Sequence, residues 1–291
     1  MPSWCNVKYR IKKGYSMDAY LTKLETEFSS LVKRSPHTNQ TCNISNMAQP
    51  CGFTSNQYSD TLFQKAYLLK YVQAYELDYI NLYEKLKQLS STLNQKSVLN
   101  ILSIGCGAGI DLNAAKKVFN NVDVVYNGVD NVHWDDRICT NESGVSYHDY
   151  GIDNIDDSIV SSADIVIFPR SITDIPKNSL KSFADRLVML NKNNFYVLCG
   201  HVHSSKSSNS QLNLGSERID AMMDIIKNAG LQIRLVEDSA PNVTEFINYR
   251  DYKVRDMCRN NRCNTGSCNF IAVKNINNKG YHHIGEVSQI V

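Results

Sequence analysis

One stretch of this chain reads Val98-Leu99-Asn100-Ile101-Leu102-Ser103-Ile104-Gly105-Cys106-Gly107-Ala108-Gly109-Ile110-Asp111. Its apolar first half predicts a buried β-strand at Val98–Ile104, and a helical pattern follows at Asp111–Phe119. Three alternating glycines at such a junction allow a tight turn and bring backbone N–H groups close to a ligand at the helix N-terminus. The stretch therefore predicts a ligand-binding loop at the start of an α/β domain.

Apolar runs and helical patterns continue to alternate after this loop. We expect further strands and helices at Val122–Val129, Val145–His148, Asp164–Phe168, Phe195–Cys199, Leu231–Val236 and Asn269–Val273 (strands), and at Asn178–Leu190 and Ser216–Asn228 (helices). Because each crossover helix must return over the sheet, this alternation builds a parallel sheet covered on both faces. The sequence thus predicts a doubly wound α/β fold, with a mostly parallel seven-stranded sheet, over residues 97–291.

The part of the chain before this domain, residues 1–96, has a different pattern and predicts a helical cap or substrate-selecting extension. Ser35–Asp60 is polar, contains two prolines and predicts a loop. Thr61–Leu93 carries apolar residues and tyrosines at three-to-four spacing without Gly or Pro, which predicts a long amphipathic helix. Its tyrosines suit either packing against a sheet or contact with a ligand, and we favour core packing.

The overall composition is typical of a folded protein and excludes a disordered or fibrous one, since 42% of the 291 residues are hydrophobic and 21% are charged. A net charge of +2, from 31 Lys and Arg against 29 Asp and Glu, indicates no overall attraction to nucleic acid or an anionic membrane. No stretch reaches the roughly 18 apolar residues that span a bilayer, and the N-terminus lacks the apolar centre of a secretory signal. We therefore expect a cytoplasmic protein without a membrane partner. Its nine cysteines are expected to be thiols, metal ligands or buried small hydrophobic residues.

The glycines of the loop have the spacing G-x-G-x-G. A dinucleotide-binding fingerprint has G-x-G-x-x-G, and Ile110 occupies the place of its last glycine, which disfavours NAD and FAD. With this loop after its first strand, the chain resembles the class I S-adenosylmethionine-dependent methyltransferases, whose first motif commonly carries an acidic residue, an apolar residue and then G-x-G-x-G. The resemblance covers Val98 to Lys274 and implies a Rossmann-like domain that binds S-adenosylmethionine.

The resemblance also implies which residues bind this cofactor. The methionine end lies on the glycine loop, here Gly105, Cys106, Gly107, Ala108 and Gly109. Asp130 lies 21 residues after Gly109, at the end of the second strand, where the family's acidic residue accepts hydrogen bonds from both ribose hydroxyls. Asp149 and Tyr150 follow the third strand, near the adenine, although a plain turn residue is an equal alternative for Asp149. Phe168 ends the fourth strand, and in the family the loop after that strand faces the transferable methyl group.

One departure from the family's first motif is Ser103, which stands where the acidic residue is usual. It leaves two hypotheses open. The first is an active S-adenosylmethionine-dependent methyltransferase whose acceptor the sequence does not define, with nucleic acid slightly preferred over a small molecule or a protein. The alternative is a catalytically inactive methyltransferase-like module that senses the cofactor or binds a protein partner.

Three polar residues near the ends of predicted strands are the candidate catalytic groups. Arg170 and Ser171 follow the fourth strand, where Arg170 suits an anionic substrate and Ser171 suits its orientation. A solvated loop charge and a helix cap are equally good interpretations of these two. His201 follows the fifth strand, where it could take a proton near neutral pH or share a metal with His203; otherwise both are idle in the polar loop that follows.

The cysteines Cys258, Cys263 and Cys268 form a C-x4-C-x4-C pattern on one short polar segment. Zinc and iron–sulfur clusters need several thiolates close together, and Cys51 or Cys42 is the expected fourth ligand. Reduced thiols that bind no metal are the alternative. Arg and Lys residues around this segment would suit phosphate contacts, and with the tyrosine-rich helix they are the reason for the slight preference for nucleic acid.

Overall fold

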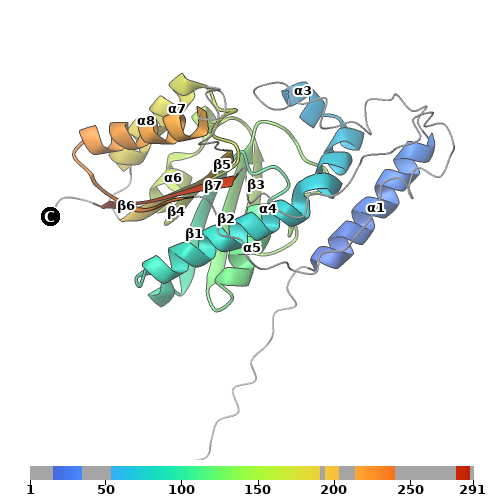
Figure 1. Cartoon of the computed structure of the whole chain (residues 1–291), viewed down its shortest axis with the longest axis horizontal. Helices are drawn as coiled ribbons and strands as arrows, with labels where there is room; N and C mark the ends of the chain where they lie inside the picture. Colours follow the sequence, from blue (N-terminus) through green and yellow to red (C-terminus); the bar gives the residue numbers. More distant parts are fainter. Residues whose placement is uncertain (1–15, 35–53, 191–193, 203–213, 240–279, 289–291) are drawn as a thin grey trace, which may run out of the picture.

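The computed structural model describes residues 16–34, 54–190, 194–202, 214–239 and 280–288. Its centre is a seven-stranded sheet with the order β3-β2-β1-β4-β5-β7-β6. The strands are β1 (Val98–Ile104), β2 (Asp123–Asp130), β3 (Val145–Asp149), β4 (Ile165–Pro169), β5 (Phe195–Val202), β6 (Gln232–Ser239) and β7 (Gly280–Ser288). Strands β1 to β5 pair in parallel, and β7 pairs antiparallel with both β5 and β6. The predicted doubly wound, mostly parallel seven-stranded sheet is confirmed (Figure 1).

Helices cover both faces of the sheet (Figure 1). One face carries α4 (Thr61–Leu89) and α5 (Ile110–Val118), with α1 (Met17–Arg34) packed against α4, and the other carries α6 (Asp157–Ser162), α7 (Lys177–Leu190) and α8 (Leu214–Asn228). The short elements are α3 (Ser55–Tyr58), η2 (Leu93–Gln95) and η3 (Ile152–Asn154). Each face of the sheet packs against its helices in a separate hydrophobic core. Successive strand residues point to opposite faces, so Ile101 packs on the α4 side and Leu102 on the α7 side. None of the helices in the described ranges is long and apolar enough to cross a membrane.

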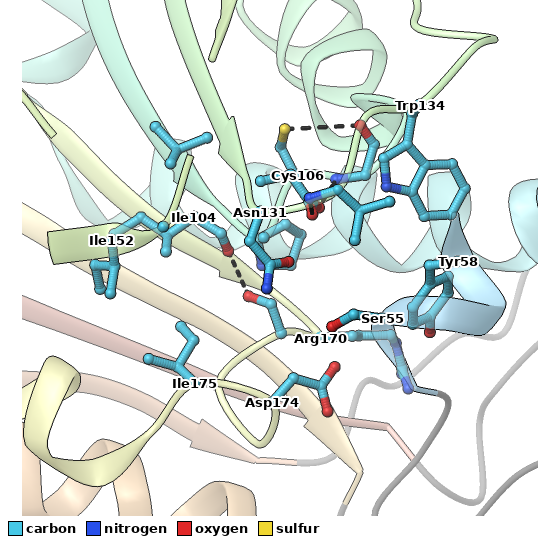
Figure 2. Close-up of a pocket in the computed structure, with 18 of the residues that line it drawn as sticks. Ser55, Tyr58, Ile104, Cys106, Asn131, Trp134, Ile152, Arg170, Asp174 and Ile175 are labelled. Atoms are coloured by element: carbon cyan, nitrogen blue, oxygen red, sulfur yellow. Dashed lines mark hydrogen bonds between the residues drawn. The ribbon is translucent and has the colours of Figure 1, made fainter. Parts of the chain in front are cut away.

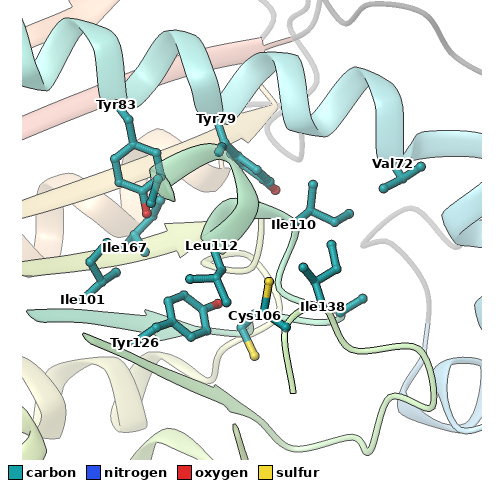
Figure 3. Close-up of a cluster of buried hydrophobic side chains, with 14 of the residues drawn as sticks. Val72, Tyr79, Tyr83, Ile101, Cys106, Ile110, Leu112, Tyr126, Ile138 and Ile167 are labelled. Carbon is teal, nitrogen blue, oxygen red and sulfur yellow. The ribbon is translucent and has the colours of Figure 1, made fainter. Parts of the chain in front are cut away.

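The long helix predicted from Thr61 onward is confirmed as α4, and the carboxylate of Asp60 accepts the N–H of Phe63 at 2.7 Å to cap its first turn. Tyr79 and Tyr83 are 3% and 0% exposed and point from α4 toward the sheet (Figure 3). Both tyrosines belong to the hydrophobic core. Core packing is thus confirmed for Tyr83, whereas Tyr79 also lines the cavity described below. Because α4 also packs along α5, it belongs to the layer that covers the sheet. The domain boundary at residue 96 stays a prediction.

Helix α1 is attached to the rest of the protein by a buried carboxylate. The Nζ of Lys65 in α4 lies 2.5 Å from both Asp136 and Glu27, so one lysine joins α1 to the loop after β2. The hydroxyl of Tyr20 donates to the backbone carbonyl of Asp136 at 2.7 Å. Burial lowers the pKa of Lys65, but hydrogen bonds to the Asp136 and Glu27 carboxylates outweigh it, and the net pKa is raised.

The strand that completes the described sheet is one that the sequence did not predict. Asn269–Val273 lies outside the described residues, and the strand that completes the sheet is β7. Its sequence, Gly-Tyr-His-His-Ile-Gly-Glu-Val-Ser, lacks an apolar run, although His282 and His283 are buried at 0% and 4% exposure. The polar side chains of this strand are accommodated by partners far away in the sequence, which no local pattern reveals.

Candidate functional site

A cavity of about 320 Å³ lies at the carboxyl ends of β1, β2 and β4. It is lined by the loops that follow β1, β2, β3 and β4 and by side chains from α3 and α4 (Figure 2). The strand order reverses between β1 and β4, because the chain builds outward from β1 first to β3 and then, in the other direction, from β4. In open α/β sheets, ligands bind at the carboxyl ends of the strands beside such a reversal.

The glycine loop after β1 has a backbone conformation that favours residues without a side chain. The φ angle is +69° at Gly105 and +56° at Gly107, in the left-handed region. The N–H groups of Gly105 and Cys106 donate to the carbonyl oxygen of Val129 at 2.7 and 3.1 Å, which holds the loop on the end of β2. A Cβ atom at Gly105 would lie only 2.2 Å from the Cβ of Ser171. The close approach of the two loops therefore requires glycine at position 105.

Asp130 ends β2 and lines the cavity next to this loop. Its Oδ2 accepts the N–H of Gly107 at 2.8 Å, and its Oδ1 accepts the N–H of Val132 at 3.0 Å. Burial raises the pKa of this carboxyl group, and the two backbone hydrogen bonds partly oppose the increase. The side chain is thus fixed in the position from which it faces the cavity.

Ser171 and Arg170 both line the cavity at the start of the loop after β4. The Ser171 hydroxyl donates to the backbone carbonyl of Ile104, so it connects the β4 loop to the end of β1. Arg170 has a φ of +61°, which is unusual for a residue with a side chain. The guanidinium lies 5.0 Å from the ring centroid of Tyr75.

The charge of Arg170 is balanced inside the protein. Its Nε and Nη2 donate to Oδ2 of Asp78 in α4 at 3.3 and 3.2 Å, and Oδ1 of Asp78 lies 2.8 Å from Nε2 of His282 in β7. Burial by itself would raise the pKa of Asp78, but Arg170 and His282 outweigh it and lower the pKa. Arg170 therefore acts first as one member of a buried cluster of charged and polar groups, and it is not a free anion clamp.

Four aromatic side chains form one side of the cavity, and we call Tyr58, Tyr67, Tyr75 and Trp134 the aromatic wall. Tyr58, Tyr67 and Trp134 contact each other, with ring centroids 5.4, 5.5 and 5.8 Å apart, and Tyr75 lies 6.2 Å from Tyr67. Trp134 is 5% exposed, and its Nε1 has no hydrogen-bond partner among the described residues. The sequence did not single out Tyr58, Tyr67 or Trp134, whereas Tyr75 belongs to the tyrosine pattern predicted for α4.

Asp174 is a second carboxylate that the sequence did not single out. It lies at the edge of the cavity, on the same loop as Arg170 and Ser171 (Figure 2). Its side chain is open to solvent on one side, yet partial burial raises its pKa to about 6. The hydrogen bond from Thr173 and the charge of Arg218 oppose this increase, and the Asp130 carboxylate adds to it. Burial and then the Asp174 carboxylate also raise the pKa of Tyr58, so that hydroxyl stays protonated.

Of the residues predicted to bind the cofactor, Gly105, Cys106, Gly107, Ala108, Asp130 and Tyr150 line the cavity. Gly109, Asp149 and Phe168 do not. Gly109 is the first residue before α5, and a Cβ there would lie 2.0 Å from the hydroxyl oxygen of Tyr147. Phe168 packs edge-on against Phe183 of α7, on the other face of the sheet.

Asp149 and His201 also point away from the cavity. The carboxylate of Asp149 lies 2.8 Å from Nδ1 of His133 and pairs with the buried guanidinium of Arg137. His201 is 2% exposed and packs against Gly215 of α8, since a Cβ on that glycine would be 2.7 Å from the imidazole ring. Among the predicted catalytic residues, Arg170 and Ser171 therefore line the cavity and His201 does not.

Ser103, at the place of the family's usual acidic residue, is fully buried in β1. A carboxylate is present nearby on α5: Asp111 is also fully buried and accepts a hydrogen bond from the hydroxyl of Tyr126 at 3.0 Å. Burial raises the pKa of Asp111 to about 6, against the opposing effect of its hydrogen bonds.

The predicted metal ligands Cys51, Cys258, Cys263 and Cys268 lie outside the described residues, as do Cys42 and His203. In the part of the chain that the structure describes, no group of three His, Cys, Asp or Glu side chains could hold a metal ion. The zinc or iron–sulfur site stays a prediction.

No family model matches the chain, and no curated protein matches its sequence. Several solved structures are similar to it at low identity. One is 1,6-didemethyltoxoflavin-N1-methyltransferase of Burkholderia thailandensis, with 9% identity over 73% of this chain and 80% of that one, at a TM-score of 0.41. A second is phosphoethanolamine N-methyltransferase 2 of Haemonchus contortus, with 16% identity over 72% of this chain and 52% of that one, at 0.42.

A third similar structure is the plantazolicin methyltransferase BpumL, with 13% identity over 94% of this chain and 99% of that one, at a TM-score of 0.40. All three structures contain bound S-adenosylhomocysteine. The chain spans about half the length of the Haemonchus enzyme. At such identities no activity passes from these proteins to this chain, and the function must be argued from its own residues.

Proposed function

We propose that this chain is an S-adenosylmethionine-dependent methyltransferase that binds its cofactor in the cavity at the glycine loop. The observation that carries the proposal is that the glycine loop and the Asp130 carboxylate line one cavity at the strand ends beside the reversal in strand order. The G-x-G-x-G spacing and Asp130 are the two features on which the family resemblance is most specific.

The cavity has groups that suit each part of this cofactor. The Asp130 carboxylate uses one lone pair of each oxygen for Gly107 and Val132, so one on each remains for the ribose hydroxyls. Tyr150, Ile152 and Ile175 supply aromatic and apolar surface for the adenine. The methionine end would lie at the glycine loop, beside Trp134.

Trp134 provides an independent test of the fit. A buried N–H group without an acceptor costs about 1 to 3 kcal/mol, so it usually indicates a partner that the protein alone does not supply. The Trp134 ring lies next to Gly107, since a Cβ on that glycine would be 3.5 Å from the indole. A ligand carboxylate at the glycine loop would be a suitable acceptor for this N–H.

When bound, S-adenosylmethionine supplies an electrophilic methyl group. The protein's own contribution is to hold an acceptor in line with that methyl group and to keep water out, which requires no dedicated base. Ser171 fixes the β4 loop against β1, and Asp78 fixes Arg170, so the wall of the site is rigid. Asp174, with its pKa near 6, is the carboxylate best able to hold a proton at the mouth of the cavity.

Calorimetric titration with S-adenosylhomocysteine, with NAD as the parallel control, tests this proposal. We expect saturable micromolar binding of S-adenosylhomocysteine and none of NAD. Absence of binding would contradict the cofactor assignment. A search by mass spectrometry for methylated RNA, protein and metabolites then separates the two hypotheses, because an inactive module binds the cofactor and forms no product.

A further inference from the structure

The ionisable side chains that line the cavity are mainly acidic. Asp130, Asp153 and Asp174 are carboxylates, and among the described residues Arg170 is the one Lys or Arg in the lining. Arg170 is paired with Asp78, which does not line the cavity, so its charge does not offset the others. Two further arginines act from outside the lining, Arg137 on Asp130 and Arg218 on Asp174, and each opposes only part of the effect of burial on its carboxylate. Like charges a few ångströms apart repel strongly in a partly desolvated site. At the Asp174 edge of the cavity, away from the backbone N–H groups of the glycine loop, an acceptor with a phosphate or carboxylate is therefore disfavoured and a cationic acceptor is attracted.

The aromatic wall also favours a cationic ligand. The face of an aromatic ring is negative and attracts a cation within about 6 Å of its centroid. Tyr75 already holds the Arg170 guanidinium in this way, at 5.0 Å. Burial raises the pKa values of Tyr58 and Tyr67, so their hydroxyls stay neutral and the rings keep this character.

Asp174 completes the pattern at the open edge of the cavity. No Lys or Arg forms an ion pair with it in the described part of the chain, where its side chain accepts a long hydrogen bond from Thr173 at 3.4 Å. Arg218 acts on the Asp174 carboxylate electrostatically but forms no ion pair with it among the described residues. An exposed carboxylate beside aromatic faces, with no cation paired directly to it, suits recognition of an ammonium group.

Resting on the proposed function, we infer that the methyl acceptor is a small amine that binds in its ammonium form against the aromatic wall, with Asp174 accepting its N–H groups. One proton passes from the ammonium group to the Asp174 carboxylate before the transfer. The free lone pair of the nitrogen then attacks the methyl carbon, the bond from methyl to sulfur breaks, and S-adenosylhomocysteine is the leaving group. This inference replaces the slight preference for nucleic acid. That preference depended partly on a basic segment outside the described residues and partly on the tyrosines of α4, and Tyr67 and Tyr75 of that helix line a cavity with acidic groups.

Three probes that share a ring and a short chain but differ in charge test the inference: 2-phenylethylamine, 2-phenylethanol and 3-phenylpropanoate. Each is titrated at pH 7.5 into the full chain saturated with S-adenosylhomocysteine, and binding is followed by ligand-observed NMR. We expect the amine to bind about tenfold tighter than the alcohol, and the carboxylate to bind weakest.

Variants assign the effect to the wall. Tyr67→Leu and Asp174→Asn should each reduce the preference for the amine over the alcohol to about twofold. Tyr71→Leu is the matched control. Tyr71 lies on the same helix, and its ring centroid is 5.0 Å from that of Tyr67, but it does not line the cavity. This variant should keep the preference for the amine over the alcohol. Thermal unfolding and S-adenosylhomocysteine affinity, measured for every variant, ensure that only folded, cofactor-binding proteins are compared.

Two outcomes overturn the inference while the proposed function stands: equal binding of the amine and the alcohol, or tightest binding of the carboxylate, each with normal S-adenosylhomocysteine affinity. A preference for the amine that survives both Tyr67→Leu and Asp174→Asn would also overturn it, since the cation would then bind elsewhere. Failure of S-adenosylhomocysteine to bind contradicts the proposed function itself, and the acceptor assignment with it.

Discussion

The carboxylate of Asp130 accepts the backbone N–H of Gly107 at 2.8 Å, so the end of β2 holds the glycine loop that follows β1. The other carboxylate oxygen accepts the N–H of Val132 at 3.0 Å. A single side chain therefore fixes two walls of the cavity before any ligand is present. Because both oxygens keep a lone pair, the same carboxylate can bind ribose hydroxyls without releasing the loop.

Replacement of Asp130 by alanine should weaken S-adenosylhomocysteine binding by about 2 kcal/mol, which is about thirtyfold, because it removes charge-assisted hydrogen bonds and frees the glycine loop. Calorimetric titration measures the change. Asp149→Ala is the matched control: its carboxylate follows the neighbouring strand but pairs with His133 and Arg137 outside the cavity, and we expect little change in affinity. Equal losses for the two variants would show that Asp130 has no special role.

Two alanine substitutions in the glycine loop should differ in their effect on stability. At Gly105 the new Cβ would lie 2.2 Å from the Cβ of Ser171, so Gly105→Ala combines left-handed strain with a displaced β4 loop, and we expect a loss of about 3 kcal/mol. At Gly107 the nearest atoms are those of Trp134 at 3.5 Å, so strain alone should cost about 1 kcal/mol. Urea unfolding of both variants measures the difference, and equal losses would contradict the tight packing at Gly105.

The sequence predicted those parts of the fold whose pattern is local. The strand at Val98–Ile104 has the predicted bounds, and α4 begins at Thr61 as expected. The sequence did not predict strand β7, because His282 and His283 interrupt any apolar pattern there. Their burial depends on contacts from elsewhere in the chain, such as the 2.8 Å contact between His282 and Asp78 of α4. Such a pairing is stabilised only by the complete fold.

In the candidate site, too, the sequence predicted the residues with a local pattern and missed those whose position depends on the complete fold. The glycine loop and Asp130 follow from their position at strand ends, which the sequence reveals. His201 was also placed at a strand end, but its side chain lies on the α8 face of the sheet, whereas neighbouring Gly200 faces Asp78 of α4. Trp134 and Asp174 were missed because they sit in loops, where no periodicity shows which side chains turn toward the cavity.

Stability should depend on pH through Asp111. Its pKa is raised from 3.8 to about 6 in the folded protein, so the folded state binds this proton more tightly than the unfolded chain. The corresponding stability is fully present below about pH 4 and is lost as pH rises through 6, a change of about 3 kcal/mol. Asp111→Asn should remove this part of the pH dependence and be more stable than the parent protein at pH 7.

Urea unfolding between pH 4 and 8 measures this effect. Asp224→Asn, on the exposed side of α8, is a matched control that should keep the parent profile. If Asp111→Asn instead lowers stability at pH 7, the ionised carboxylate contributes more through its hydrogen bond with Tyr126 than its burial costs.

The buried pair of Asp78 and Arg170 should show strong energetic coupling. Asp78 is fully buried and Arg170 has 10% of its side chain exposed, so removal of one charge leaves the other without compensation. Asp78→Asn should therefore lower the free energy of unfolding by about 3 to 5 kcal/mol. In the double variant with Arg170→Met no charge is left unpaired, and the total loss should be well below the sum of the two single losses. A double-mutant cycle by urea unfolding measures this coupling, and additive losses would mean that the two side chains contribute to stability independently.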